Sequence, residues 1–271
     1  MHSLSSARES AITSQENVSI GVNPAVFTVE RHGADGKTGG FASGLVYSQT
    51  SVTENIPILI NPGEMRLKKL RSSVITAARL HVQERPRWKV CMVTPTYAPE
   101  HDWHPKHITG LVRSIREFLK RKGYEMRYVW VQEYTKKGRP HYHLLIWLPR
   151  GVTLPKPDKR GWWPWGMTKI EWAKNAIGYI AKYASKGDSL HQPESGARMH
   201  GNGGLTGAAL LEARWWKLPR WARLQVLPAD RCRRRVGGGL LIPETGEILQ
   251  SPWVVLFDHG FIWLTRRPTA V

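Results

Sequence analysis

The fold of this chain is decided by residues 124–148, YEMRYVWVQEYTKKGRPHYHLLIWL. The stretch holds two β-prone runs, 124–134 and 142–148, joined by a short loop that contains Gly138. Two such runs around a short glycine-containing loop predict a β-hairpin. Upstream, the apolar run VCMVT at 90–94 predicts a buried strand.

Helical spacing of apolar residues appears on both sides of these strands. Residues 108–119 have one apolar and one basic face, and Gly123 stands where a helix-ending glycine belongs. Further patterns predict a basic amphipathic helix over 64–85, helices over 172–186 and 205–216, and a strand over 254–257. The order strand, helix, strand, strand favours an α+β fold with a central antiparallel sheet of the split βαβ type and helices on one of its faces.

Composition divides the chain into three parts. Residues 1–60 are expected to be poorly ordered, because they are rich in Ser, Gly, Thr and Asn and lack clear periodicity. Residues 61–190 are expected to form the folded domain, with the basic helix at its start. Residues 191–271 are expected to be a basic C-terminal extension. The basic face of the first helix either contacts a polyanion or is simply solvated.

The net charge restricts the partner. Forty Lys and Arg residues against 21 Asp and Glu give +19, which indicates a polyanionic partner, by default nucleic acid. A basic membrane-surface protein would need an amphipathic segment beside an acyl site or an apolar span, and neither is evident. No signal peptide or membrane-spanning segment is expected. Two cysteines, Cys91 and Cys232, give no disulfide framework and favour a cytoplasmic protein.

A metal site is indicated by His141 and His143. Alternate residues of a strand share a face, so both imidazoles can bind one ion. If the hairpin loop is odd in length, Glu133 falls opposite His143 as a third ligand, and if it is even, Gln132 does. We favour Glu133, because a carboxylate with two histidines suits Mg²⁺ or Mn²⁺. The alternative is a histidine pair on an edge strand without a metal.

A second candidate motif is Tyr-x-x-Lys, which occurs twice in succession over 179–186, YIAKYASK. On a helix, Tyr179 and Tyr183 are i and i+4 and emerge on one face. A phenol is a poor nucleophile at neutral pH, and a nearby ammonium such as that of Lys182 lowers its pKa. In the alternative, the tyrosines pack at the edge of the core and the lysines are solvated.

Together the two motifs meet one chemical requirement. Opening a phosphodiester by transesterification needs a nucleophile, an ion to offset phosphoryl charge, and a cationic surface for the strand. Unpaired bases can stack on tryptophans, although the tryptophans of 161–166 can equally be buried against the sheet. The DNA-contact candidates are Lys137, Arg139, Trp163, Lys186 and, in the basic cluster 231–235, Arg234.

These motifs resemble those of the HUH endonucleases, which have His, a bulky residue, His, and then one or two catalytic tyrosines. The likeness is to rolling-circle replication initiators of filamentous phages (inoviruses). It rests on Thr94-Pro95-Thr96, on a Glu before Gly138-Arg139-Pro140-His141, and on the tyrosine helix, which also resembles that of isometric-phage initiators. The likeness covers about 88–186, and 198–204 and 234–239 are similar too. Tyr142 departs from the usual aliphatic residue, and Pro95 indicates that its strand ends or lies at an edge there.

The resemblance implies a palm-like fold and a nicking and ligating activity. One tyrosine, for which the order along the helix favours Tyr179, would form a 5′-phosphotyrosine at a DNA origin with Mg²⁺ or Mn²⁺. The other would cut again after one round. The implied partners are the origin DNA and a host helicase and polymerase in the bacterial cytoplasm. The alternatives are a non-catalytic DNA-binding protein, a transposase or relaxase of the same superfamily, and a phosphoesterase that uses water.

Overall fold

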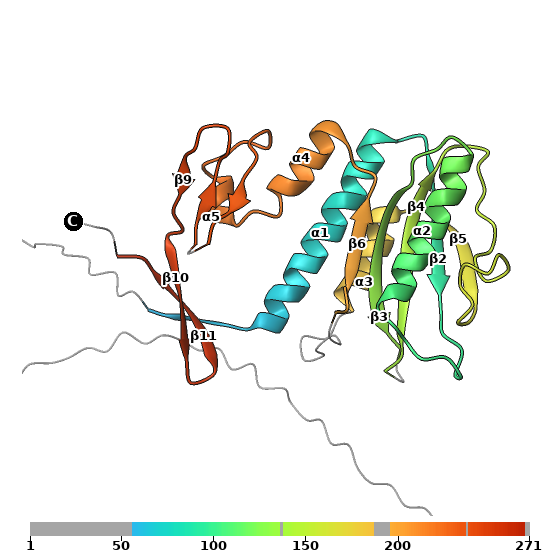
Figure 1. Ribbon diagram of the computed structural model, residues 1–271, viewed down its shortest axis with the longest axis horizontal. Coiled ribbons are helices and arrows are strands. Elements are labelled where there is room, and N and C mark those ends of the chain that lie inside the picture. Colours follow the sequence, from blue (N-terminus) through green and yellow to red (C-terminus); the bar gives the residue numbers. More distant parts are fainter. Residues whose placement is uncertain (1–55, 136–137, 187–195, 237, 269–271) are drawn as a thin grey trace, which may run out of the picture. The chain divides into compact units, whose positions relative to one another are not determined.

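The computed structural model describes residues 56–135, 138–186, 196–236 and 238–268. Its centre is a five-stranded antiparallel sheet in the order β5-β2-β4-β3-β6 (Figure 1). These strands are β2 (Lys89–Pro95), β3 (Arg127–Tyr134), β4 (Pro140–Leu148), β5 (Thr168–Ala173) and β6 (His200–Gly203). The predicted hairpin is β3 with β4, and the predicted buried strand is β2, which ends at Pro95. The α+β class with a central antiparallel sheet is confirmed.

Helices cover both faces of this sheet, so the expectation of helices on one face is wrong. On one face, α1 (Pro62–Glu84), α3 (Ala176–Ser185) and α4 (Gly207–Trp215) pack on residues such as Leu145 and Trp147. On the other face, α2 (Lys106–Arg121) packs on Tyr142 and Leu144. The physical reason lies in β4, where both sets of alternating side chains from 144 to 148 are apolar, so both faces must be covered.

The predicted helix over 64–85 is α1, and its apolar face lies in the core. Asn61 caps its first turn by accepting hydrogen bonds from the amides of Gly63 and Glu64 at 2.9 and 3.2 Å. Leu70 and Val74 are buried, whereas Lys68 is exposed. The packing accounts for this helix, and contact of its exposed lysines with DNA stays a prediction.

Two predicted boundaries need correction. The third helix begins at Ala176 and not at Trp172, because Trp172 pairs with Cys91 as part of β5 and Asn175 then caps the helix. The central sheet also extends beyond residue 190, since β6 pairs with β3. Gly201 permits this pairing: a Cβ on it would lie 2.5 Å from the indole nitrogen of Trp130.

The C-terminal part contains two small sheets. The first has the order β1-β11-β10 and consists of β1 (Ile58–Ile60), β10 (Trp253–Asp258) and β11 (Phe261–Arg266). It includes the strand predicted over 254–257. The second consists of β7 (Arg233–Arg234), β8 (Leu240–Leu241) and β9 (Ile248–Leu249), beside the short helix α5 (Arg220–Arg223). Within the described residues, no helix has the length and apolarity needed to span a membrane.

A buried histidine makes the fold sensitive to acid. His81 on α1 is fully buried beside Trp147, at 4.6 Å between ring centroids. Burial, followed by the charge of Arg127, lowers the pKa of His81 to about 3. Between this value and about 6.5 the unfolded chain binds a proton that the folded chain excludes, so stability falls as pH falls.

We expect His81 to cost about 2 kcal/mol of unfolding free energy on going from pH 7 to pH 5. In His81→Leu, which keeps an apolar side chain of similar volume in the core, this part of the pH dependence should disappear. Urea unfolding of both proteins at the two pH values measures it. An equal loss of stability in the wild type and the variant would contradict the assignment.

Candidate metal and tyrosine site

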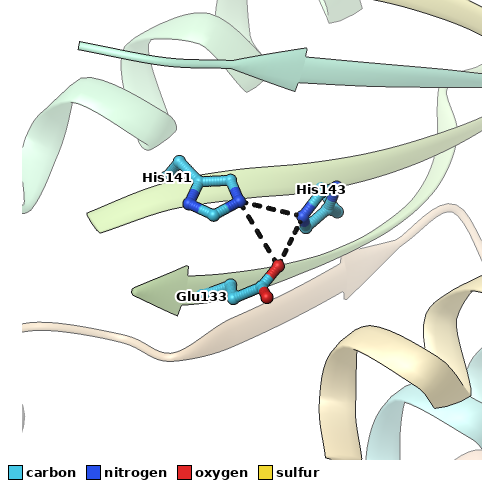
Figure 2. A group of neighbouring side chains, drawn as sticks. All are labelled: Glu133, His141 and His143. Carbon is cyan, nitrogen blue, oxygen red and sulfur yellow. Dashed lines mark hydrogen bonds and ion pairs between the residues drawn. The ribbon is translucent and has the colours of Figure 1, made fainter. Parts of the chain in front are cut away.

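Three side chains that could hold a metal ion converge at one end of the β3–β4 hairpin (Figure 2). Nε2 of His143 lies 2.8 Å from Oε2 of Glu133 and 3.1 Å from Nε2 of His141, and Nε2 of His141 lies 3.3 Å from the same Oε2. Adjacent ligands of an octahedral ion with bonds of about 2.1 Å are about 3.0 Å apart. The three atoms therefore fit the coordination sphere of one small divalent cation.

The register selects Glu133 and corrects one detail. The loop is odd in length, as the choice of Glu133 required, but Glu133 pairs directly with His141 and lies diagonal to His143. Gln132 belongs to the opposite face, where it is buried and donates to the hydroxyl of Tyr134 at 3.2 Å. Tyr142 is fully buried in the core, as expected for the residue between the histidines.

The protonation states of these groups suit a cation. Burial lowers the pKa of His141, and it lowers the pKa of His143 to about 4, so both imidazoles are neutral at pH 7. Burial opposes ionisation of Glu133, but hydrogen bonds from Lys186 and His143 outweigh it and lower the pKa of this carboxyl. Two neutral imidazoles and one carboxylate are a donor set for Mg²⁺, Mn²⁺ or a related divalent ion.

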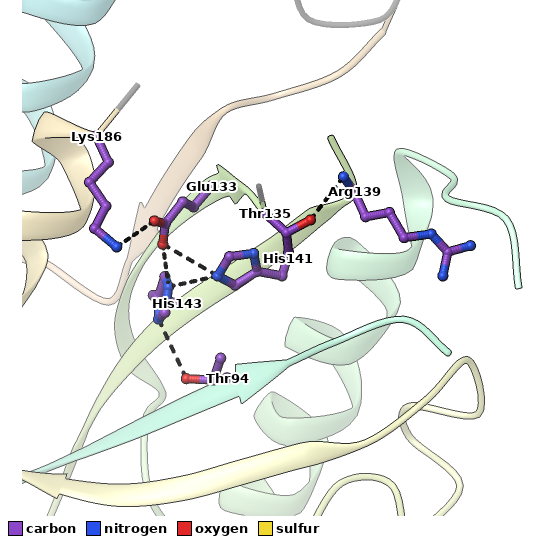
Figure 3. Close-up of polar contacts among 7 residues, drawn as sticks. All are labelled: Thr94, Glu133, Thr135, Arg139, His141, His143 and Lys186. Carbon is purple, nitrogen blue, oxygen red and sulfur yellow. Dashed lines mark hydrogen bonds and ion pairs between the residues drawn. The ribbon is translucent and has the colours of Figure 1, made fainter. Parts of the chain in front are cut away.

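Further contacts orient two of the ligands (Figure 3). Oγ1 of Thr94, on β2, lies 3.4 Å from Nδ1 of His143, so a proton on Nδ1 leaves Nε2 unprotonated toward the other ligands. Nζ of Lys186 donates to Oε1 of Glu133 at 2.6 Å, which leaves Oε2 toward the histidines. Thr94 was noticed in the sequence as part of a motif, but its role toward His143 was not.

Tyr183 lies directly against the ligand group. Its ring stacks on that of His143 at 3.4 Å between centroids and 12° between planes. The ammonium groups of Lys182 and Lys186 lie 5.7 and 5.2 Å from the Tyr183 ring centroid. Burial raises the pKa of Tyr183, and Lys186 acts in the opposite direction. Tyr179, one turn earlier, is 36% exposed.

The tyrosine helix is fixed at both ends. Asn175 accepts a hydrogen bond from the amide of Gly178 at 2.8 Å at the start of α3. At its end, Arg71 of α1 donates from Nε to the carbonyl of Ala184 at 3.3 Å and from Nη2 to that of Ser185 at 3.2 Å. Sequence reasoning treated the basic residues of α1 as a possible DNA surface and missed this contact, since it joins residues 113 and 114 positions apart.

Removal of the Arg71 cap should loosen the end of α3. We expect Arg71→Met, which keeps most of the apolar stem, to lose about 1 kcal/mol of stability and to speed amide exchange in the last turn of α3. Hydrogen–deuterium exchange measures this effect, with Lys68→Met on the exposed face of α1 as the control. Equal exchange in both variants would mean that the cap contributes nothing.

The structure assigns several predicted DNA-contact residues to other contacts. Trp163 is fully buried and donates to the carbonyl of Thr96 at 3.0 Å, so it cannot stack on a base, and that prediction is wrong. Arg139 donates to the carbonyls of Ala98 and Pro99 at 2.9 and 2.7 Å, which ties the hairpin to the loop after β2. For Arg139, DNA contact stays a prediction.

The remaining candidates are Arg234 and Lys137. Arg234 is exposed on β7, and its contact with DNA stays a prediction. Lys137 lies outside the described residues.

Comparison with known proteins points to replication proteins. Residues 90–188 match a family of replication-associated proteins whose description names the ORF2 protein. The matched segment includes the three ligands and both tyrosines. The chain is also 28% identical to "Replication-associated protein ORF2" of Spiroplasma virus 4, over an alignment that covers 40% of this chain and 42% of the relative's length. No solved structure matches the chain significantly.

Proposed function

We propose that this chain is a metal-dependent DNA-nicking enzyme of the HUH type that initiates rolling-circle replication of a phage. The observation that carries the proposal is the stacking of Tyr183 on His143 within the Glu133–His141–His143 group. The similarity of residues 90–188 to replication-associated proteins supports a role in phage replication. The charge of +19 supports DNA as the partner.

In this proposal Tyr183 is the first nucleophile, in place of Tyr179, which the order along the helix had favoured. Its phenol oxygen forms a bond to the scissile phosphorus, and the bond from phosphorus to the 3′ oxygen breaks. The phenol proton passes to water, and the leaving oxygen takes up a proton. The products are a 5′-phosphotyrosine and a 3′-hydroxyl, from which a host polymerase, with a host helicase, could extend in the cytoplasm.

The other site residues have supporting roles. Glu133, His141 and His143 would hold the cation, which when bound offsets charge on the phosphoryl oxygens. Lys186 holds the Glu133 carboxylate in its orientation, and exposed Lys182 is available to the phosphate. Tyr179 would cut the regenerated origin while Tyr183 stays esterified, because residues i and i+4 share a helix face. The freed 3′-hydroxyl would then rejoin the old 5′ end, which is the ligase half of the activity.

An adduct assay tests the proposal. Purified full-length chain is incubated with single-stranded oligonucleotides that tile the replicon encoding it, with Mn²⁺ or with EDTA, and run on a denaturing gel. We expect a covalent protein–DNA band that requires Mn²⁺. Cleavage without an adduct would indicate a phosphoesterase that uses water. Binding with neither cleavage nor adduct would leave a non-catalytic DNA-binding protein.

A further inference from the structure

One edge of the β1-β11-β10 sheet is open and apolar. β10 is the outer strand, and its first five residues, WVVLF, are apolar without interruption. Within the described part of the chain, no strand pairs with its outer edge. Val255, Leu256 and Phe257 are 50%, 45% and 78% exposed. Natural edge strands usually carry a charge, a proline or a bulge that prevents pairing, and this run has none of them.

The edge is also regular, as a strand that accepts a partner must be. β10 and β11 pair over six consecutive positions without a bulge, from Trp253 with Arg266 to Asp258 with Phe261. Their two-residue turn has positive φ at both His259 (45°) and Gly260 (80°), the backbone of a type I′ turn, which matches the twist of paired strands. The hairpin thus presents a defined row of backbone donors and acceptors.

We propose that this edge binds a second copy of the same chain, with the two β10 strands antiparallel about a two-fold axis at Val255. An antiparallel two-fold pairing puts the axis perpendicular to the sheet, so opposed residues share a face and the axis passes through one residue of each strand. Val255 and Leu256 are the central residues of β10 and hence the two choices.

Side-chain complementarity selects Val255. With the axis there, Trp253 lies opposite Phe257 of the second copy, which makes two aromatic pairs. Asp258 of the second copy then lies opposite Pro252, in the same row and on the same face as Arg267, whose amide donates to the Pro252 carbonyl at 2.8 Å. Two Asp258–Arg267 charge pairs result. With the axis at Leu256, Asp258 would instead lie opposite apolar Val254.

Cysteine cross-linking reads the register directly. In a Cys232→Ser background, with Cys91 buried, Val255→Cys should form an intermolecular disulfide under mild oxidation, since residues opposed on the axis are about 5 Å apart. Leu256→Cys and Phe257→Cys, which are offset by two and four residues from their symmetry mates, should not. Strongest cross-linking at 256, or equal cross-linking at all three positions, would overturn the register.

Light scattering of the full-length chain over a concentration series, at moderate salt to screen the net charge, should show twice the chain mass. Asp258→Arg and Arg267→Asp should each weaken the dimer about tenfold, and their combination should restore it. Within one hairpin the two residues stand roughly 20 Å apart, so restoration cannot come from one chain. A monomer at every concentration, or no restoration, would refute the proposal, and the first result would leave the edge to another segment or partner.

Discussion

His143→Ala should abolish metal-dependent nicking, with the cleavage rate at least about 10³-fold lower, because the cation supplies several kcal/mol of charge stabilisation at the phosphate. His143 is the central ligand: its Nε2 lies 2.8 Å from Glu133 and 3.1 Å from His141. Calorimetric titration with Mn²⁺ measures the loss of binding, and the adduct gel measures the loss of cleavage.

Two variants separate a lost ligand from a damaged fold. Glu133→Gln keeps the shape of the side chain but removes its charge, so it should also weaken Mn²⁺ binding. His200→Ala is the matched control, since His200 pairs with Val131 from β6 as His143 does from β4, yet it is not among the converging ligands. Nicking by His143→Ala at the wild-type rate, with or without added Mn²⁺, would exclude this metal site from the reaction.

Tyr183→Phe should remove the first covalent adduct and lower the cleavage rate by at least about 10³-fold, because phenylalanine lacks the attacking oxygen. The variant keeps the ring that stacks on His143, so Mn²⁺ affinity should stay unchanged. Mass spectrometry of the tryptic peptide that contains both tyrosines locates the attached nucleotide in the wild type.

Tyr179→Phe is the comparison for this prediction. It should still form the first adduct at close to the wild-type rate but fail to transfer the strand in a second cleavage. A wild-type rate in Tyr183→Phe together with an adduct on Tyr179 would reverse the two roles. Loss of the first adduct in both single variants would mean that neither tyrosine acts alone.

The sequence by itself determined the parts that depend on local spacing. Strand period two put His141 and His143 on one face, and the odd loop put Glu133 with them. Helical period put Tyr179 and Tyr183 on one side of α3, and composition supplied the charge. Each of these features is set by residues within about ten positions of one another, where the backbone alone fixes which side chains share a face.

Only the tertiary structure decided which distant segments meet. It chose Tyr183 over Tyr179 as the neighbour of His143, brought Thr94 and Arg71 to the site, and buried Trp163. It also placed β6 at the edge of the sheet and helices on both faces. These outcomes depend on the packing of side chains between elements far apart in the chain, and no local periodicity specifies which faces are placed together.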